Sequence, residues 1–217
     1  MFCLTVNKQT ELRLIDRQHS AELLALLDLN RGYVRRWHPW VDNLRTSAAV
    51  EKVAAIWQVQ YANRRGLYPG IWFNGRLCGM VGLHTVDQAN RWAPIFYWLD
   101  EAHQGQGIAT ECCRAMIAHA FTTWKLNRIT IECATENARS RAIPERLGFQ
   151  LEGIVRGVEW LQDRFVDHAV YGLLRSDLAK PCSLDTKRYR GMGREDSQRA
   201  EDCPRQRINR YTTVAPP

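Results

Sequence analysis

The sequence Gln104-Gly105-Gln106-Gly107-Ile108-Ala109-Thr110 follows the apolar run 95–99 and leads into the segment 106–124. The run is typical of a buried strand, and apolar residues at every third or fourth position of the segment predict an amphipathic helix. The first N–H groups of a helix lack internal partners and carry the positive end of its dipole, and glycines let the backbone approach an anion closely. The stretch therefore predicts a strand–loop–helix that binds a pyrophosphate, although a plain glycine turn into a helix would have the same sequence.

Two other classes of phosphate-binding loop do not fit this stretch. A Walker loop ends in Gly-Lys-Ser/Thr, whereas Ile108-Ala109 stands at that place. A dinucleotide fingerprint needs a third glycine near Thr110 and an acidic residue at the end of the next strand, which here ends in Cys133-Ala134. The sequence thus excludes both nucleotide classes.

On either side of this stretch, apolar strands alternate with helices whose apolar residues recur with a period near 3.6. Asn74-Gly75 predicts a two-residue hairpin because both turn positions need a positive φ, and Gly148 is the predicted left-handed end of the last helix. The predicted order is β-α-α-β-β-β-α-β-α-β-β. The strands are expected at 11–15, 71–73, 77–83, 95–99, 128–134, 151–160 and 165–173, and the helices at 21–27 onward, 50–61, 106–124 and in a segment ending at 147.

A second polar motif follows the strand 128–134. Asn137 is a suitable helix N-cap, and capping alone would explain it. Ser140 lies one turn further, and Pro144 has no N–H with which to bond the Ser140 carbonyl. A hydroxyl and a freed carbonyl are therefore expected close together, as a polar site between two strand ends.

Three motifs in order resemble the GNAT acetyltransferase superfamily, and the last two resemble its RimJ/RimL branch, the ribosomal-protein N-acetylases. The resemblance covers about residues 10–178 and implies an α/β (α+β) GNAT fold. In this fold a mixed, mostly antiparallel sheet is splayed between strands 4 and 5 and flanked by helices. The motifs are Gln104-x-x-Gly107-x-Ala109, the run Asn137-Ala138-Arg139-Ser140-Arg141-Ala142-Ile143-Pro144-Glu145-Arg146-Leu147-Gly148-Phe149, and Trp37-His38-Pro39-Trp40.

The resemblance implies acetyl-CoA as cosubstrate, without a metal, and direct transfer of its acetyl group to an amine. It assigns Ser140 as the general acid toward the departing thiolate and Glu159 as the base. Trp37, Trp40 and Glu159 would contact the acceptor, although tryptophans more often serve packing. The residues implied to bind the cofactor are Tyr97, Trp98, Leu99, Gln104, Gly105, Gln106, Gly107, Ile108, Ala109, Thr110, Asn137 and Ser140. Family members commonly carry an acidic residue and a glycine where Pro94 and Phe96 stand, so the chain departs from the pattern there.

The chemistry of amide formation supports these roles independently. A protonated amine cannot attack a thioester, so a base such as Glu159 must first remove one proton. His84 and His168 are alternative bases, and each could equally be a strand histidine with satisfied hydrogen bonds. Cys133 is expected in the core because no base flanks it in sequence.

Composition and charge favour a soluble globular protein over a nucleic-acid-binding or membrane protein. Of the net charge of +7, the segment 180–217 supplies +4 (nine Lys/Arg minus five Asp/Glu), which leaves +3 for the body. We predict an acetyltransferase domain at 1–179 and a basic, disordered tail at 180–217. The sequence has no run of 18 apolar residues and its start lacks a signal-peptide pattern, so a cytoplasmic location is expected. Seven cysteines without C-x-x-C spacing argue against a disulfide framework or a zinc site.

Three functions remain open at this point. The first is acetylation of a protein N-terminus, in the manner of RimL, and the second is acetylation of a small amine such as a polyamine, an antibiotic or an amino-acid conjugate. The third is an acyl-CoA-binding module without turnover, which Ser140 and Glu159 disfavour. Arg31, Arg35, Arg36 and Arg45 make the segment 31–45 basic, which favours an acidic or peptide acceptor over a polycation. The resemblance is also compatible with a homodimer.

Overall fold

The computed structural model describes residues 2–179 of the 217-residue chain. Its elements follow the predicted order, preceded by one short additional strand, β1, which is too short to leave a readable pattern. The strands are β1 Cys3–Thr5, β2 Thr10–Leu14, β3 Pro69–Phe73, β4 Arg76–Leu83, β5 Trp92–Leu99, β6 Arg128–Ala134, β7 Gln150–Leu161 and β8 Arg164–Leu174. The helices are α1 Ser20–Val34, α2 Ser47–Ala62, α3 Ile108–Thr122 and α4 Ala138–Arg146, with 3-10 turns η1 Arg17–His19, η2 Pro39–Asn43, η3 Glu101–His103 and η4 Arg175–Ala179.

The eight strands form one mixed sheet in the order β1-β2-β3-β4-β5-β6-β8-β7. All neighbours in it are antiparallel except β5 and β6, which are parallel. β5 and β6 pair only from Trp92↔Arg128 to Pro94↔Thr130, so the two strands separate beyond Pro94. This confirms the predicted splay, because β5 and β6 are the fourth and fifth strands of the sequence-based order.

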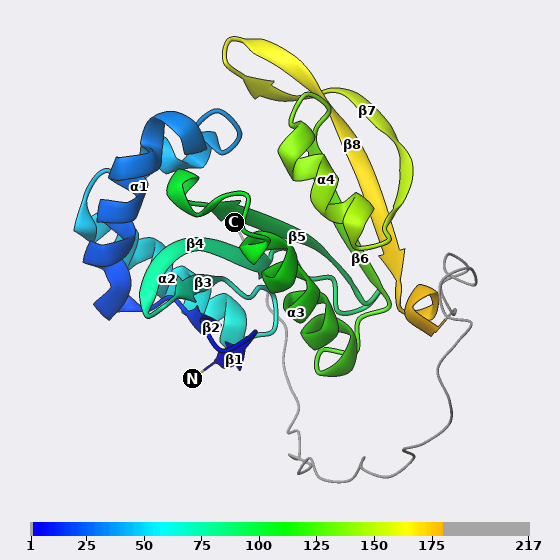
Figure 1. The fold of residues 1–217 in the computed structure, drawn as a ribbon, viewed down its shortest axis with the longest axis horizontal. Helices are drawn as coiled ribbons and strands as arrows, with labels where there is room; N and C mark the ends of the chain where they lie inside the picture. The colour runs from blue at the N-terminus through cyan, green and yellow to red at the C-terminus, as the bar shows by residue number, and fades with distance from the viewer. Residues whose placement is uncertain (1, 180–217) are drawn as a thin grey trace, which may run out of the picture.

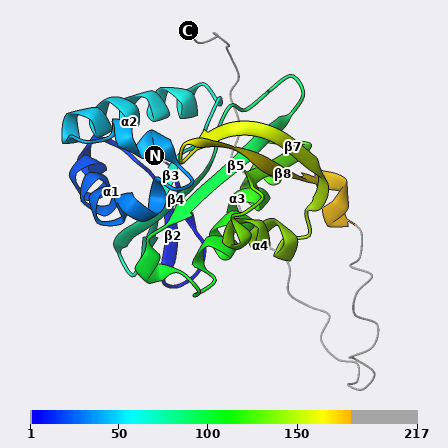
Figure 2. The same cartoon turned by 90° about the horizontal axis from the view of Figure 1, so that it is seen from above.

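Helices cover the sheet on both faces, with α1 and α2 on one side and α3 and α4 on the other (Figures 1 and 2). One core packs α3 and Ile143 of α4 against side chains such as Ile95, Tyr97 and Ile131. The second core packs α1 and α2 against Trp72, Met80 and Trp98. Strand alternation therefore sends neighbouring residues of β5 to opposite faces of the sheet.

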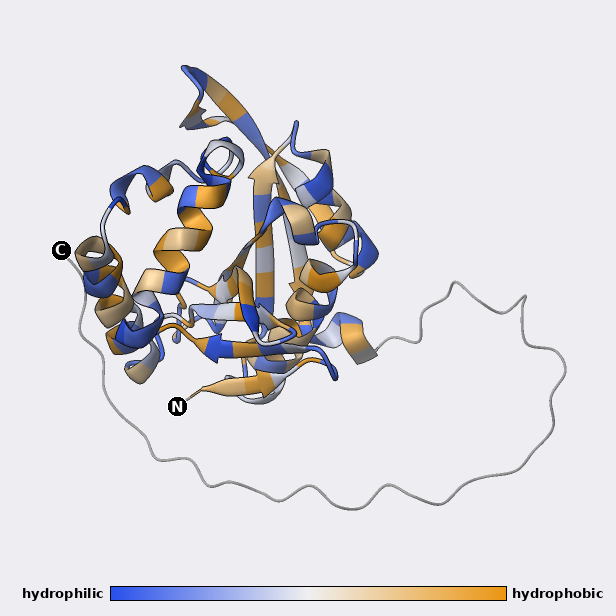
Figure 3. Cartoon of the chain, turned by 60° about the vertical axis from the view of Figure 1, so that its left-hand side comes forward, coloured by the Kyte–Doolittle hydropathy of each residue, from blue (hydrophilic) through white to orange (hydrophobic). Residues whose placement is uncertain are grey.

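The hairpin of β7 and β8 projects from the body (Figure 1), and its arm carries apolar segments, drawn in orange in Figure 3. Two turn predictions are confirmed by the backbone. Asn74 and Gly75 have φ values of 49° and 77° in the turn between β3 and β4, and Gly148 has a φ of 80° after α4. None of the helices among residues 2–179 is both long and apolar enough to cross a bilayer. The predicted tail at 180–217 lies outside the described residues, so the domain boundary at 179 stays a prediction.

Candidate active site

A cavity of about 610 Å³ lies where β5 and β6 separate. Tyr97 and Cys133 reach it from the face of the sheet that α3 and α4 cover. Phe96 and Ala134 reach it from the opposite face, where they pack with the second core and with Trp37. The cavity therefore passes through the sheet and joins its two faces.

Ser140 and Tyr97 form a hydroxyl pair on the α4 side of the cavity. The Tyr97 hydroxyl donates to the Ser140 carbonyl at 2.9 Å, and the Ser140 hydroxyl donates to the Tyr97 oxygen at 3.2 Å. This carbonyl is the one that Pro144 leaves without a helical partner, so the predicted freed acceptor is taken by a residue of β5. Asn137 is the predicted N-cap and accepts from the Ser140 N–H at 3.1 Å. Burial raises the pKa of the Tyr97 phenol well above its ordinary value, so this group stays protonated at neutral pH.

The loop before α3 has the backbone that an anion site requires. Gly105 and Gly107 have φ values of 75° and 78°, in the left-handed region that favours glycine. Gly107 is the N-cap of α3, and no side chain caps this end of the helix. The first N–H groups of α3 therefore keep their capacity to bind a phosphate. Arg139 of α4 donates to the Gln104 side chain at 2.5 Å and connects this loop to the motif around Ser140.

Glu159 and His168 form a pair at the other side of the cavity, with 2.8 Å between Oε2 and Nε2. A β-bulge brings them together. Val155 pairs with His168 and Glu159 pairs with Val166, so β7 advances four residues where β8 advances two. Gly157, with a φ of 56°, lies inside the bulge, and its N–H donates to the Asp167 carboxylate at 2.8 Å. Bulges of this kind redirect side chains at active sites, and here the bulge directs the Glu159 carboxylate into the cavity.

Two further histidines line the cavity. Burial lowers the pKa of His38 from its ordinary value of 6.5 to about 4, and the nearby Glu159 only partly opposes this. Burial also lowers the pKa of His84, and the backbone N–H of this residue donates to the Pro94 carbonyl at 3.2 Å. Both imidazoles are therefore uncharged at neutral pH.

Cys133 lines the cavity as a buried thiol, as predicted for a core residue. Burial raises the pKa of this thiol to about 11, which disfavours the thiolate that a nucleophile would need. Within residues 2–179, no group of three His, Cys, Asp or Glu side chains is placed to hold a metal ion.

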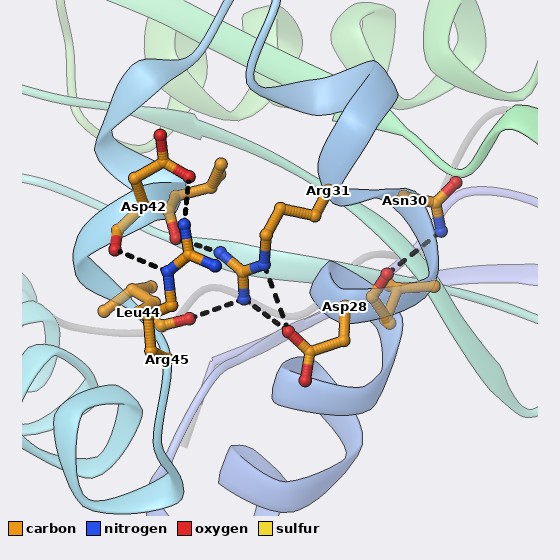
Figure 4. A network of polar contacts seen from close by, with 8 residues as sticks. Asp28, Asn30, Arg31, Asp42, Leu44 and Arg45 are labelled. Carbon is orange, nitrogen blue, oxygen red and sulfur yellow. Dashed lines mark hydrogen bonds and ion pairs between the residues drawn. The ribbon is translucent and has the colours of Figure 1, made fainter.

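The connection between α1 and α2 covers the cavity with Trp37 and Trp40, and a polar network holds it in place (Figure 4). Arg31 donates to the carbonyls of Val41 and Leu44, the latter at 2.7 Å, and to the Asp28 carboxylate. Asp42 pairs with both Arg35 and Arg45 at 2.9 Å. Three arginines of the basic segment thus hold the loop together, and neither they nor Arg36 line the cavity.

The structure brings together six of the predicted site residues: Trp37, Trp40, Tyr97, Asn137, Ser140 and Glu159. Trp98 and Leu99 do not line the cavity, since their side chains lie in the two cores on opposite faces of the sheet. The loop 104–110 also lies outside the cavity and meets its α4 side through Gln104 and Arg139.

Sequence reasoning left several cavity features without a role. The partnership of Tyr97 with Ser140 spans 43 residues and has no local signal. His38 belongs to the Trp37-His38-Pro39-Trp40 motif but was given no function there. Glu132 lies within the predicted strand 128–134 and carried no functional prediction. Gly157 in the middle of an apolar strand is a recognisable sign of the bulge at Glu159.

Comparison with known proteins gives one consistent family. Residues 9–150 match the family model described as "Acetyltransferase (GNAT) domain". The "Putative ribosomal N-acetyltransferase YdaF" of Bacillus subtilis is 35% identical over 178 residues, which are 82% of this chain and 97% of that protein. The ribosomal-protein-serine acetyltransferase of Escherichia coli is 29% identical over 172 residues, 77% of this chain and 94% of its own. Among solved structures, RimL, a ribosomal L7/L12 alpha-N-protein acetyltransferase in complex with coenzyme A, has a TM-score of 0.78 at 25% identity, covering 80% of this chain and 98% of that one.

Proposed function

The chain belongs to the GNAT acetyltransferase family, and from that premise we propose that it acetylates the α-amine of a protein N-terminus, with Glu159 as base and Ser140 as acid. That it is an N-acetyltransferase using acetyl-CoA follows from the family itself. The proposal rests above all on one observation. A single cavity crosses the splayed sheet, with the Ser140–Tyr97 pair on one face and the Glu159–His168 pair on the other.

The loop 104–110 and Asn137 are proposed to hold acetyl-CoA. The uncapped first turn of α3 suits its pyrophosphate, because N–H groups and the helix dipole both favour an anion there. The pantetheine arm would then follow the gap between β5 and β6 toward Ser140, next to which Asn137 is held as the cap of α4. Of the β5 residues predicted to bind the cofactor, Tyr97 lines the cavity, and Trp98 and Leu99 support the strand from the two cores.

Glu159 is proposed to take the proton that the ammonium must lose before it attacks. Its carboxylate lines the cavity and is oriented by the His168 imidazole at 2.8 Å. An oriented carboxylate within the acceptor half satisfies the first requirement for a general base, which is geometric reach. His84 lies on the strand β4 side and stays the alternative base, since its lowered pKa leaves it uncharged and able to accept a proton.

Ser140 is proposed to donate a hydrogen bond, and then a proton, to the sulfur that leaves. Its hydroxyl now donates to Tyr97, and rotation about the Cβ–Oγ bond can turn the same hydrogen toward the cavity. Tyr97 remains a donor throughout, because its raised pKa keeps the phenol protonated. The two hydroxyls together provide the acid that the thiolate needs.

A protein N-terminus is the proposed acceptor because two relatives that match over more than nine-tenths of their length are named as ribosomal or ribosomal-protein acetyltransferases. The second candidate is a small amine, which the tryptophans, tyrosines and phenylalanine in the cavity lining favour. Turnover of acetyl-CoA against peptide N-termini and small amines, followed by thiol release, separates the two. Thiol release with small amines alone would contradict the N-terminal assignment, and no release with any amine would contradict the whole proposal.

A homodimer remains a prediction from the resemblance. Size-exclusion chromatography with light scattering measures it directly, and a monomer mass at micromolar concentration would contradict it.

A further inference from the structure

The cavity has two chemically different ends. The carboxylates of Glu132 and Glu159 lie at the end formed by β6 and β7. Glu159 is paired with His168, whereas Glu132 makes no hydrogen bond or ion pair with any residue in the described range. Register places Ala134 opposite His168 and Glu132 opposite Val170, so Glu132 and His168 are diagonal neighbours on one face of the sheet.

The other end of the cavity is aromatic and uncharged. Trp40 and Trp57 come from η2 and α2, Tyr68 precedes β3, and Phe96 comes from β5. Trp57 and Tyr68 stack at 5.2 Å, and Tyr68 and Phe96 approach at 5.5 Å, so these three rings form a continuous surface, while the Trp40 ring lies beside His38. Burial raises the pKa of Tyr68 to about 12, so its phenol carries no charge at neutral pH.

Over residues 2–179, the cavity has no Lys or Arg that could balance the charge of an anionic acceptor. Of the three histidines that line it, His38 and His84 are uncharged at neutral pH, and His168 is paired with the Glu159 carboxylate. Arg31, Arg35 and Arg45 are bound to Asp28 and Asp42 instead (Figure 4), and Arg36 does not line the cavity. A carboxylate or phosphate in this cavity would therefore be desolvated without a partner and would face two like charges.

We infer that the acceptor is a monoamine whose ammonium group is joined directly to an uncharged, large apolar or aromatic group. This inference rests on the proposed function and specifies its substrate class. The ammonium lies toward Glu132 and Glu159, and the apolar group fills the end lined by Trp40, Trp57 and Phe96. Such an acceptor can come from a peptide that begins with phenylalanine or leucine, or from an arylalkylamine. A peptide that begins with serine would leave the aromatic end unfilled, and one that begins with aspartate would place a carboxylate in it.

Peptide amides that share residues two to five and differ only in the first residue test this inference. With the wild-type enzyme and saturating acetyl-CoA, thiol release should give kcat/KM at least tenfold higher for a first residue of phenylalanine or leucine than for serine, and lowest for aspartate. 2-Phenylethylamine, free phenylalanine and spermidine form the small-molecule arm. 2-Phenylethylamine should be acetylated well, free phenylalanine poorly because of its carboxylate, and spermidine poorly because its further ammonium groups lack partners. The ratio of kcat/KM for the phenylalanine peptide to kcat/KM for 2-phenylethylamine shows whether a peptide or a small amine is the preferred acceptor.

Two variants test the two ends of the cavity. Asn43 is exposed at the cavity rim, so Asn43→Arg adds a cation without disturbing the core. It should raise kcat/KM for free phenylalanine and for the aspartate peptide at least fivefold over Asn43→Gln, the neutral control. Trp40→Ala should reduce the ratio of kcat/KM for the phenylalanine peptide over the serine peptide at least fivefold. Retention of the acetyl-CoA thermal shift verifies that each variant is folded.

A preference for serine, aspartate or spermidine, with turnover intact, would overturn the inference and leave the proposed function standing. An unchanged phenylalanine-to-serine ratio in a folded Trp40→Ala variant would overturn it as well. A protein that shows neither an acetyl-CoA thermal shift nor thiol release with any amine would instead contradict the proposed function.

Discussion

Glu159 and Ser140 face the cavity from opposite sides of the sheet, and their proposed tasks fall at different moments of the reaction. Glu159→Gln keeps the shape of the side chain but cannot take a proton, so kcat should fall by about 10²–10⁴-fold with little change in acetyl-CoA affinity. The rate loss at acidic pH that protonation of a carboxylate base causes should vanish with it. Ser140→Ala should also lower kcat but keep that pH dependence, because serine does not titrate there.

Initial rates measured between pH 5 and 9 on one acceptor amine distinguish Glu159→Gln from Ser140→Ala. A second acceptor amine with a low pKa gives an independent comparison of the two variants. The low-pKa amine loses its proton more readily and should rescue Glu159→Gln more than Ser140→Ala. Asp163→Asn, an acid-to-amide change at the tip of the same hairpin and outside the cavity, is the matched control. Full activity in Glu159→Gln would remove Glu159 as the base and direct attention to His84 or His168.

Among the elements, the loop before α3 depends on the backbone of Gly107. A β-branched residue at a φ of 78° is strained, by about 1–3 kcal/mol, and would displace the N–H groups that the first turn presents. Gly107→Val should therefore abolish the thermal shift given by acetyl-CoA. In the wild type, acetyl-CoA at 100 times Kd is expected to raise the free energy of unfolding by about 2.7 kcal/mol. Gly75→Val is the matched control, because Gly75 has a φ of 77° and, as at Gly107, a Cβ atom added there would meet no other atom within 4 Å. It should lose similar stability and keep the shift; loss of the shift in both variants would point to general destabilisation.

Pro144 inside α4 keeps the Ser140 carbonyl available to Tyr97. Pro144→Ala restores an N–H that can bond this carbonyl within the helix, in competition with the Tyr97 hydroxyl. We expect the free energy of unfolding to rise by roughly 1–3 kcal/mol while kcat falls about tenfold, since the hydroxyl pair loses its anchor. Tyr97→Phe should lower kcat to a similar degree without stabilising the helix. A Pro144→Ala enzyme that is more stable and fully active would show that the interruption of α4 at Pro144 is not needed for catalysis.

At the scale of the whole molecule, partly buried histidines make stability depend on pH. Burial lowers the pKa of His38 to about 4 and also lowers those of His84 and His119. Between pH 4 and 6.5 the unfolded chain binds more protons than the folded one, so the free energy of unfolding decreases as the pH is lowered through this range. His38 alone would contribute a loss on the order of 3 kcal/mol by pH 4. Melting temperatures from pH 7.5 to 4.5 should fall accordingly, and His38→Gln should flatten the decline; an equal decline in this variant would refute the contribution of His38.

The segment 180–217 is predicted to be dispensable for catalysis, because it has no apolar periodicity and few residues suited to a core. A chain that ends at Lys180 should retain kcat/KM within a few-fold. Steady-state assays on the full and shortened proteins decide this, and a loss of a hundredfold or more would mean that the segment supports the fold or binds substrate.

The sequence by itself determined the order and type of nearly every element, because each depends on local physics. Apolar periodicity marked the strands and helices, and Asn74-Gly75 and Gly148 marked positions where positive φ is needed. The two motifs around Gly107 and Ser140 were readable for the same reason, since capping, a missing proline N–H and glycine backbones act within one or two turns.

Only the tertiary structure decided which of these residues meet. Tyr97 reaches Ser140 across the splay of β5 and β6, and a bulge at Gly157 brings Glu159 to His168. The basic segment at 31–45 was expected to favour an acidic or peptide acceptor. In the structure Arg31, Arg35 and Arg45 are bound to Asp28 and Asp42, and no arginine of the segment lines the cavity. Such pairings are made between elements distant in sequence, where strand register and burial, not local propensity, select the partner. For that reason the reaction type could be predicted from the sequence, whereas the polarity of the acceptor cavity could be determined only from the tertiary structure.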